Sequence, residues 1–278
     1  MSSLGVDARA SGRNAIMTKK KTTKKFECKN NVCKNKNGPY EPKLTITVTA
    51  KSLTTFLDAV GTVRQEARVH VTDTGLKVFQ VDSANVCMIN TELKCKMVSE
   101  DGAPKIFGVD IAHLRKLLIH SKGATVSLVV TASGIEMSYS RFSGKCCVVD
   151  TIDMRKDPDK EPDMTLNAHI DIPGKYLFET SQVFGKSGKI LFETVGSVIY
   201  LSAECGDLTF REVVGTVTNP KTEQIRSIYS GDYIHGIAKF VKDAPIHIDV
   251  GIDHPIIIST DKDDCTVRFL LAPRIEED

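Results

Sequence analysis

The feature that most constrains the fold is an internal repeat on either side of a charged, proline-containing segment. Segment 152–165 reads I-D-M-R-K-D-P-D-K-E-P-D-M-T. Proline removes a backbone donor and charged side chains resist burial, so this segment is predicted to be an exposed linker. Three positions before the linker recur after it at a constant offset of 122 residues: Leu44 as Leu166, Phe56 as Phe178, and Asp110 as Asp232. The constant offset predicts a duplicated domain.

The repeat and the linker together predict where the chain divides. Its 278 residues suffice for two domains of about 100 to 150 residues each. The predicted parts are a basic extension at 1–42, a first domain at 43–151, the linker at 152–165 and a second domain at 166–278.

Hydrophobic periodicity predicts the same order of elements in both halves. Alternating segments such as Lys43–Thr49 predict half-buried strands, and apolar residues at i, i+3, i+4 and i+7 predict helices. Pro173 suits a first helical position, and the turn at Ser143-Gly144 is expected to precede a strand at 145–151. The four predicted helices are Lys51–Arg64, Val109–Lys122, Pro173–Lys189 and Gly231–Asp243. The fold class is therefore α+β, with antiparallel sheets covered on one face by two helices per repeat.

The first 42 residues differ in composition from the rest of the chain. They contain ten Lys or Arg and three acidic residues, a net charge of +7, so the remainder carries −5. With little apolar content this extension is predicted to be disordered. A basic arm can bind phosphate, act as a nuclear address or have no role. The spacing of Cys28 and Cys33 without a second pair argues against a zinc site.

Several classes of protein are excluded by composition and motifs. No run of about 18 apolar residues is present, so no membrane span is expected. The eight cysteines are scattered, which favours reduced thiols in an intracellular protein. Neither H-E-x-x-H nor G-x-S-x-G occurs, and no catalytic residue, metal site or cofactor is predicted. Asp261-Lys-Asp-Asp264 reads as a turn, although a metal-dependent nuclease would need such a carboxylate group.

Positive charge is concentrated on the predicted helices of an otherwise acidic body. The four helices carry ten Lys or Arg and five acidic residues, a net charge of +5, which leaves −10 for the rest of the body. Aromatic residues are not interleaved, so we expect contact with the phosphate backbone and no reading of bases. The candidate phosphate contacts are Lys51, Arg64, Arg115, Lys116, Lys122, Lys175, Lys186, Lys189, Lys239 and Lys242.

Three short motifs resemble those of a known family. Leu271-Ala-Pro-Arg-Ile-Glu276 resembles the L-A-P-K/R-I-E ending of eukaryotic and archaeal sliding clamps. Val81-Asp-Ser-Ala-Asn-Val86 resembles the M-D-S-S-H-V loop of proliferating cell nuclear antigen, and Asp253-His-Pro-Ile256 resembles its D-x-P segment. The resemblance covers Lys43–Asp278, and the basic extension lies outside it.

The resemblance implies a function without catalysis. Sliding clamps of this family are homotrimeric rings whose helices line the hole and whose sheets form the outside. Such a ring encircles double-stranded DNA without sequence preference and acts as a processivity factor for DNA polymerase. It also binds the clamp loader and other replication and repair proteins through short motifs. The expected location is intracellular: the nucleus in a eukaryote or its virus, the cytoplasm in an archaeon. A subunit of a heteromeric checkpoint or repair ring remains an alternative.

The resemblance also implies two sets of contact residues. The family methionine and histidine are Val81 and Asn85 in this chain, so the preference for partner motifs can differ. The partner groove would use Val81, Asn85, Met154, Pro255, Ala272, Pro273 and Ile275, with Arg274 and Glu276 at its rim. The subunit contact would pair the edge strands Gly144–Asp150 and Cys205–Phe210, and would include Cys146, Cys147, Val148, Gly206 and Leu208.

Overall fold

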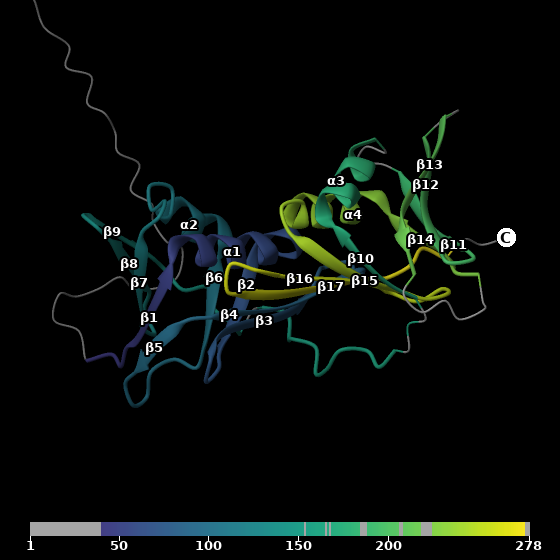
Figure 1. The fold of residues 1–278 in the computed structure, drawn as a ribbon. Helices are drawn as coiled ribbons and strands as arrows, with labels where there is room; N and C mark the ends of the chain where they lie inside the picture. The colour runs from purple at the N-terminus through teal and green to yellow at the C-terminus, as the bar shows by residue number, and fades with distance from the viewer. Residues whose placement is uncertain are drawn as a thin grey trace, which may run out of the picture. The chain divides into compact units, whose positions relative to one another are not determined.

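The chain folds as two copies of one arrangement of strands and helices (Figure 1). The computed structural model describes residues 40–152, 154–164, 166, 168–183, 188–205, 208–217 and 224–275. The predicted basic extension before Tyr40, together with Lys186, Gly206 and Glu276, lies outside the described residues.

The first repeat contains nine strands and two helices. Its strands are β1 (Leu44–Thr49), β2 (Glu66–Val71), β3 (Gly75–Val81), β4 (Cys87–Lys94), β5 (Lys96–Ser99), β6 (Ile106–Asp110), β7 (Thr125–Val130), β8 (Ile135–Tyr139) and β9 (Phe142–Cys146). Its helices are α1 (Ala50–Val63) and α2 (Ile111–Leu117).

The second repeat contains eight strands and two helices. Its strands are β10 (Ala168–Pro173), β11 (Lys189–Val195), β12 (Val198–Cys205), β13 (Leu208–Thr216), β14 (Arg226–Ser230), β15 (Pro245–Val250), β16 (Ile256–Lys262) and β17 (Cys265–Leu271). Its helices are α3 (Gly174–Val183) and α4 (Gly231–Val241). Sequence periodicity missed β5 and β14.

Strand pairing repeats along with element order. The first repeat forms the runs β1-β7-β8-β9 and β6-β2-β3-β4, with β5 added beside β1. The second forms β10-β15-β16-β17 and β14-β11-β12-β13, all antiparallel. The two halves share one sheet because β4 pairs with β17, from Cys87 opposite Leu271 to Leu93 opposite Cys265. The predicted duplication of an antiparallel α+β unit is confirmed.

Helices α2, α3 and α4 are shorter than predicted, whereas α1 has the predicted length and begins one residue earlier. The Thr49 side chain accepts a hydrogen bond from the Ser52 amide at 3.1 Å and begins α1, and Asp110 begins α2 in the same way. Helix α2 ends at Leu117, five residues before the predicted end, because Leu118 bonds to Arg115 in a tighter turn. Pro173 lies at the end of β10, paired with Pro245, and not at a first helical position.

The strand expected at 145–151 was also placed wrongly. Strand β9 runs from Phe142 to Cys146 and contains the predicted Ser143-Gly144 turn. The turn lies instead at Ser140, whose φ is +49°, where Phe142 stacks on Tyr139 with ring centroids 4.8 Å apart. Beyond β9 the chain leaves β8, and Val149 bridges to Gly108 on β6.

The two faces of the shared sheet have different partners. On β17, Phe269 points to the helices and packs edge-on against Phe240 of α4, with centroids 5.8 Å apart. Its neighbour Arg268 points to the opposite face because side chains alternate along a strand, and there it pairs with Glu161 of the linker at 3.2 Å. Helices therefore cover one face of this sheet and the linker crosses the other. No helix in the described part of the chain has the length and apolar character needed to cross a membrane.

Candidate functional site

The helical layer carries less positive charge than the sequence suggested. Within the observed helix bounds there are five Lys or Arg against three Asp or Glu, a net charge of +2 and not +5. Lys122 follows α2 in a turn, and Lys189 begins β11. Arg64 and Lys242 lie at the C-caps of α1 and α4, where a cation is favoured by the helix dipole. Lys116 and Lys239 are exposed on α2 and α4.

Three predicted phosphate contacts are paired with carboxylates. Lys51 Nζ lies 2.7 Å from Asp263 Oδ1, and this hydrogen bond raises the pKa of Lys51. Arg115 pairs with Asp58 at 2.9 Å, and Lys175 pairs with Glu179 at 3.4 Å. The side chains of all three cations are more than half exposed, so they remain accessible to a phosphate group.

The turn between β16 and β17 contacts the helical layer at α1. Asp263 and Asp264 both have positive φ, which confirms the predicted turn, and their carboxylates accept hydrogen bonds from Thr55 and Ser52 of α1 at 2.8 Å. These acids thus hold the first repeat to the second. Lys262, which the sequence analysis missed, lies over the Phe240 ring at 5.6 Å and adds a cation beside α4.

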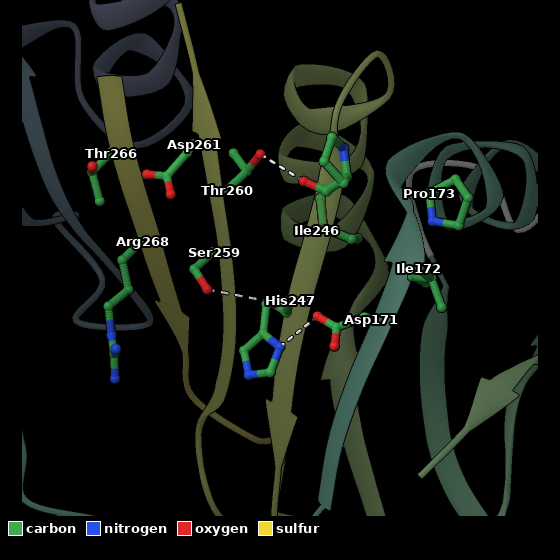
Figure 2. Close-up of a pocket in the computed structure, with 11 residues that line it drawn as sticks. Asp171, Ile172, Pro173, Ile246, His247, Ser259, Thr260, Asp261, Thr266 and Arg268 are labelled. Carbon is green, nitrogen blue, oxygen red and sulfur yellow. Dashed lines mark hydrogen bonds and ion pairs between the residues drawn. The ribbon is translucent and has the colours of Figure 1, made fainter. Parts of the chain in front are cut away.

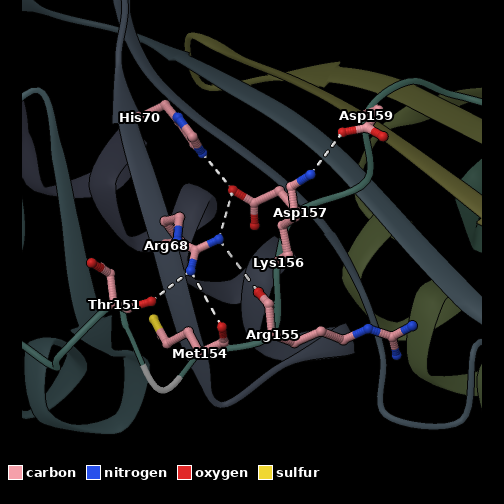
Figure 3. Close-up of polar contacts among 8 residues, drawn as sticks. All are labelled: Arg68, His70, Thr151, Met154, Arg155, Lys156, Asp157 and Asp159. Carbon is pink, nitrogen blue, oxygen red and sulfur yellow. Dashed lines mark hydrogen bonds and ion pairs between the residues drawn. The ribbon is translucent and has the colours of Figure 1, made fainter.

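The linker is docked on the opposite face of the sheet by Arg68 (Figure 3). The guanidinium of this β2 residue donates to the carbonyl oxygens of Thr151 at 2.6 Å and Met154 at 3.3 Å. Asp157 Oδ2 lies 2.6 Å from His70 Nε2 and 3.4 Å from Arg68 Nη1. The described residues of the linker have no regular secondary structure, as predicted, but side chains of the sheet fix their path.

The loop between β3 and β4 is organised by the buried carboxylate of Asp82, which is 5% exposed. Its Oδ1 accepts from the amides of Val86 at 2.8 Å and Cys87 at 3.0 Å, and its Oδ2 accepts from the Tyr233 hydroxyl of α4. Burial alone would raise the pKa of Asp82, but these hydrogen bonds outweigh burial and hold it below its usual value. Burial and the Asp82 carboxylate raise the pKa of Tyr233 to about 12.

Several of the predicted groove residues lie around this loop. Arg155 of the linker donates to the Asp82 carbonyl at 3.0 Å and to the Asn85 side chain, so the linker and the loop are joined. The Ala272 amide donates to the Val86 carbonyl at 2.8 Å, which places the C-terminal segment beside the same loop. Val81, Met154, Pro255, Ala272 and Pro273 are partly buried, whereas Asn85 and Ile275 are exposed.

An apolar row on the linker face was missed by the sequence analysis. Met88, Leu270 and Ile257 are directly opposite one another on β4, β17 and β16, and Val81 is opposite Met88. Met164 and Leu166 from the end of the linker cover this row. The signal was present in the sequence, because Ile256-Ile257-Ile258 and Phe269-Leu270-Leu271 break the alternation expected of a half-solvated strand.

Two of the predicted subunit contacts, Cys146 and Leu208, lie on strands at the ends of their sheets, whereas Cys147 and Val148 follow β9 outside any strand. Strand β9 ends one sheet and β13 ends another, so each presents an edge that pairs with nothing in the order given by the described residues. Cys146 and Val148 are partly buried and Cys147 is exposed; burial raises the pKa of Cys146 to about 11. Leu208 begins β13.

The chain is similar over most of its length to archaeal proteins named DNA polymerase sliding clamp. The relative from Methanosphaerula palustris is 30% identical over 253 residues, which cover 84% of this chain and 100% of the relative. The relative from Methanothrix thermoacetophila is 29% identical over 243 residues, with 83% and 98% covered. No family model matches the chain.

Solved structures share its fold. A. fulgidus PCNA, solved with the C-terminal region of FEN-1 bound, matches with a TM-score of 0.74 and 22% identity, covering 84% of this chain and 100% of that one. PCNA from Entamoeba histolytica matches with a TM-score of 0.74 and 14% identity, covering 84% and 99%. The predicted fold class is confirmed by these likenesses.

Proposed function

This chain belongs to the DNA polymerase sliding clamp family, and from that premise we propose that identical copies close into a homotrimeric ring around duplex DNA. The ring tethers a DNA polymerase and so raises its local concentration at the primer end. The chain acts by binding and performs no chemical step of its own.

The observation that carries this proposal is the equivalence of two strand pairs. Strand β9 holds the place in the first repeat that β17 holds in the second, and β13 holds the place of β4. Within the chain, β17 pairs with β4. The equivalent pair, β9 with β13, is formed between neighbouring copies. Closure in a ring also pairs two edges that would otherwise promote aggregation.

The strand registers within the chain predict which residues meet across this contact. Phe142 of β9 is equivalent to Cys265 of β17, because each begins the second strand of the same hairpin in its repeat. Leu208 of β13 is equivalent to Cys87 of β4, because the two strands pair with their neighbours in the same way. Transferring the β4–β17 register then places Thr209 opposite Cys147 of the next copy. The same transfer places Phe210 opposite Cys146.

This register is tested by disulfide trapping. Thr209→Cys in the full chain is expected to form a disulfide with Cys147 of a neighbouring copy under mild oxidation, giving covalent dimers and trimers on denaturing gels. Val213→Cys is the matched control, because the transferred register places Ser143 opposite it and no thiol. Light scattering of the reduced protein is expected to give three times the chain mass of 30.5 kDa. A monomer at every concentration refutes the ring, and would favour a subunit of a heteromeric ring.

We assign the DNA-facing surface to the helical layer. Its cations include the exposed Lys116 and Lys239 and the partly buried Lys262, and lysine contacts to phosphate carry no sequence information, which suits a ring that slides. Neutralising Lys116 and Lys239 is expected to lower the salt slope of binding to closed circular DNA by about 0.9 per lost phosphate contact. Lys156→Ala on the linker is the control; an equal effect there contradicts the assignment.

We assign the partner site to the groove between the linker, the Asp82 loop and the C-terminal segment. Its support is the convergence of Arg155 and Ala272 on that loop and the apolar row beside it. A peptide with one aliphatic and two aromatic anchors is expected to bind, as measured by fluorescence anisotropy. Ala272→Asp should abolish binding and Lys145→Ala on β9 should not. The proposed location is with DNA: the nucleus in a eukaryotic or virus-infected cell, the cytoplasm in an archaeon.

A further inference from the structure

Outside these surfaces, strand pairing assembles a cluster of histidine and aspartate side chains. His169 and Asp171 of β10 lie directly opposite Asp249 and His247 of β15. Among the described residues, His169, His247 and Asp249 form the one group of three His, Cys, Asp or Glu side chains whose ligand atoms all lie within 4.8 Å of one another. No metal site was predicted from the sequence, because these histidines are far apart in the chain.

The cluster lies on the face of the sheet that the linker crosses. Directly opposite positions across paired strands share a face, and Arg268, Ser259, His247 and Asp171 form one such row (Figure 2). Arg268 also contacts the linker, through Glu161. The side chains of His169 and His247 are each 42% exposed, and His247 and Asp171 also line a depression of about 830 Å³. An ion can therefore reach the cluster without unfolding the sheet.

The hydrogen-bonding capacity of His247 leaves one contact unexplained. Its Nδ1 lies 2.8 Å from Asp171 Oδ1, and its Nε2 lies 2.9 Å from Asp249 Oδ1. A neutral imidazole carries one N–H, and an ionised carboxylate only accepts. If Nδ1 donates to Asp171, then Nε2 directs a lone pair at the Asp249 oxygen. The nitrogen lone pair and the carboxylate oxygen then repel each other, and a second proton or a metal ion between them removes this repulsion.

The other ligand atoms converge on the same point. His169 Nδ1 lies 2.5 Å from the same Asp249 Oδ1, and the two imidazole rings are nearly parallel at 9°. Zinc bonds of about 2.0 to 2.2 Å in a tetrahedral arrangement separate ligand atoms by about 3.3 to 3.5 Å. Opening the two contacts by less than about 1 Å therefore admits an ion. With neutral histidines, Asp171 and Asp249 give the cluster a charge that a divalent cation balances.

We propose that His169, His247 and Asp249 bind a divalent transition-metal ion, represented by Zn²⁺, on the face of the sheet that the linker crosses. Two imidazoles and one carboxylate suit zinc and leave a fourth position for water. Asp171 accepts a hydrogen bond from Nδ1–H of His247. This bond fixes the orientation of the ring and leaves Nε2 unprotonated to bind the metal. The ion links β10, the terminal strand of the eight-stranded sheet, to β15.

The test is zinc binding to the chelator-stripped full chain, carrying Cys28→Ser and Cys33→Ser so that these thiols do not compete. Titration against a chromogenic chelator is expected to give one zinc per chain. His247→Ala should abolish this binding, and Asp171→Asn should weaken it by about 10- to 100-fold. His70→Ala is the control, because His70 is also a strand histidine beside an aspartate, Asp157, and lacks the second histidine.

Two further readouts separate a built site from loose surface binding. Co²⁺ in place of zinc should give the visible absorption of a tetrahedral or five-coordinate site, and His169→Ala should remove it. Zinc at about 100 times its dissociation constant should raise the unfolding temperature by several degrees. Absence of stoichiometric zinc binding, or equal binding by the His247→Ala and unsubstituted proteins, overturns the proposal. Circular dichroism shows whether each variant is folded, and Asp249→Asn provides a second ligand change.

Discussion

Replacing Tyr233 with Phe tests whether one buried carboxylate joins the two repeats. Tyr233 on α4 donates its hydroxyl to Asp82, which is 5% exposed in the loop between β3 and β4. A hydrogen bond to a charged group contributes about 1.5 to 3 kcal/mol, so Tyr233→Phe should lower the free energy of unfolding at pH 7 by that amount. The assay is urea denaturation followed by circular dichroism. Tyr176→Phe, at a tyrosine that is 49% exposed on α3, is the matched control.

The effect should depend on pH with a defined sign. The pKa of Asp82 is lower in the folded protein than the ordinary value of an aspartate, so its ionised form stabilises the fold above the unfolded pKa. This contribution is lost as pH falls through the folded pKa. The difference between Tyr233→Phe and the unsubstituted protein should therefore shrink below about pH 4. A difference under about 0.5 kcal/mol at pH 7, or one that grows in acid, refutes this account of Asp82. Because this loop borders the proposed peptide groove, Tyr233→Phe should also weaken peptide binding.

Three other predictions follow from local contacts. A Cβ on Gly174 would lie 2.1 Å from the Val241 carbonyl oxygen, so Gly174→Ala should destabilise the protein by about 1 to 3 kcal/mol in thermal unfolding. Gly236→Ala in α4, where the nearest atom would be 3.6 Å away, should be neutral or stabilising, and equal losses would contradict the steric argument. Asp157→Asn should speed trypsin cleavage at Lys156 and Lys160, since it weakens linker docking; Asp159→Asn, whose side chain is 88% exposed, should not. Burial raises the pKa of Cys87 and of Cys265 to about 12, so iodoacetamide at pH 8 should spare both until urea unfolds the chain; rapid labelling of the folded protein would contradict this.

The predictions that succeeded depended on local periodicity and on the repeat. Strand β1 was predicted to within one residue of its observed bounds because Lys43–Thr49 alternates between the core and solvent. The turn at Asp263 and Asp264 followed from short polar residues between two apolar runs. The family motifs marked the C-terminal segment and the Asp82 loop, and the linker was recognised from its prolines and charges.

The predictions that failed depended on where packing ends an element. Apolar spacing continued the second helix to Lys122, but tighter turns end it at Leu117. The charge assigned to the helical layer fell from +5 to +2 for the same reason, since cations near helix ends were counted as helical. The predicted edge strand moved to Phe142–Cys146 because the stacking of Phe142 on Tyr139 fixes a tight hairpin.

The sequence by itself determined that the chain is a duplicated α+β protein with a polar linker between its halves, because side-chain periodicity and repeat spacing are local properties. Tertiary structure alone decided which residues from distant segments meet. Pairing of β10 with β15 brings His169 and Asp171 against Asp249 and His247, and packing of α4 brings Tyr233 to Asp82. Such contacts depend on strand register and on helix docking. Both are selected by burial of the whole core, so they cannot be predicted from any single segment of the sequence.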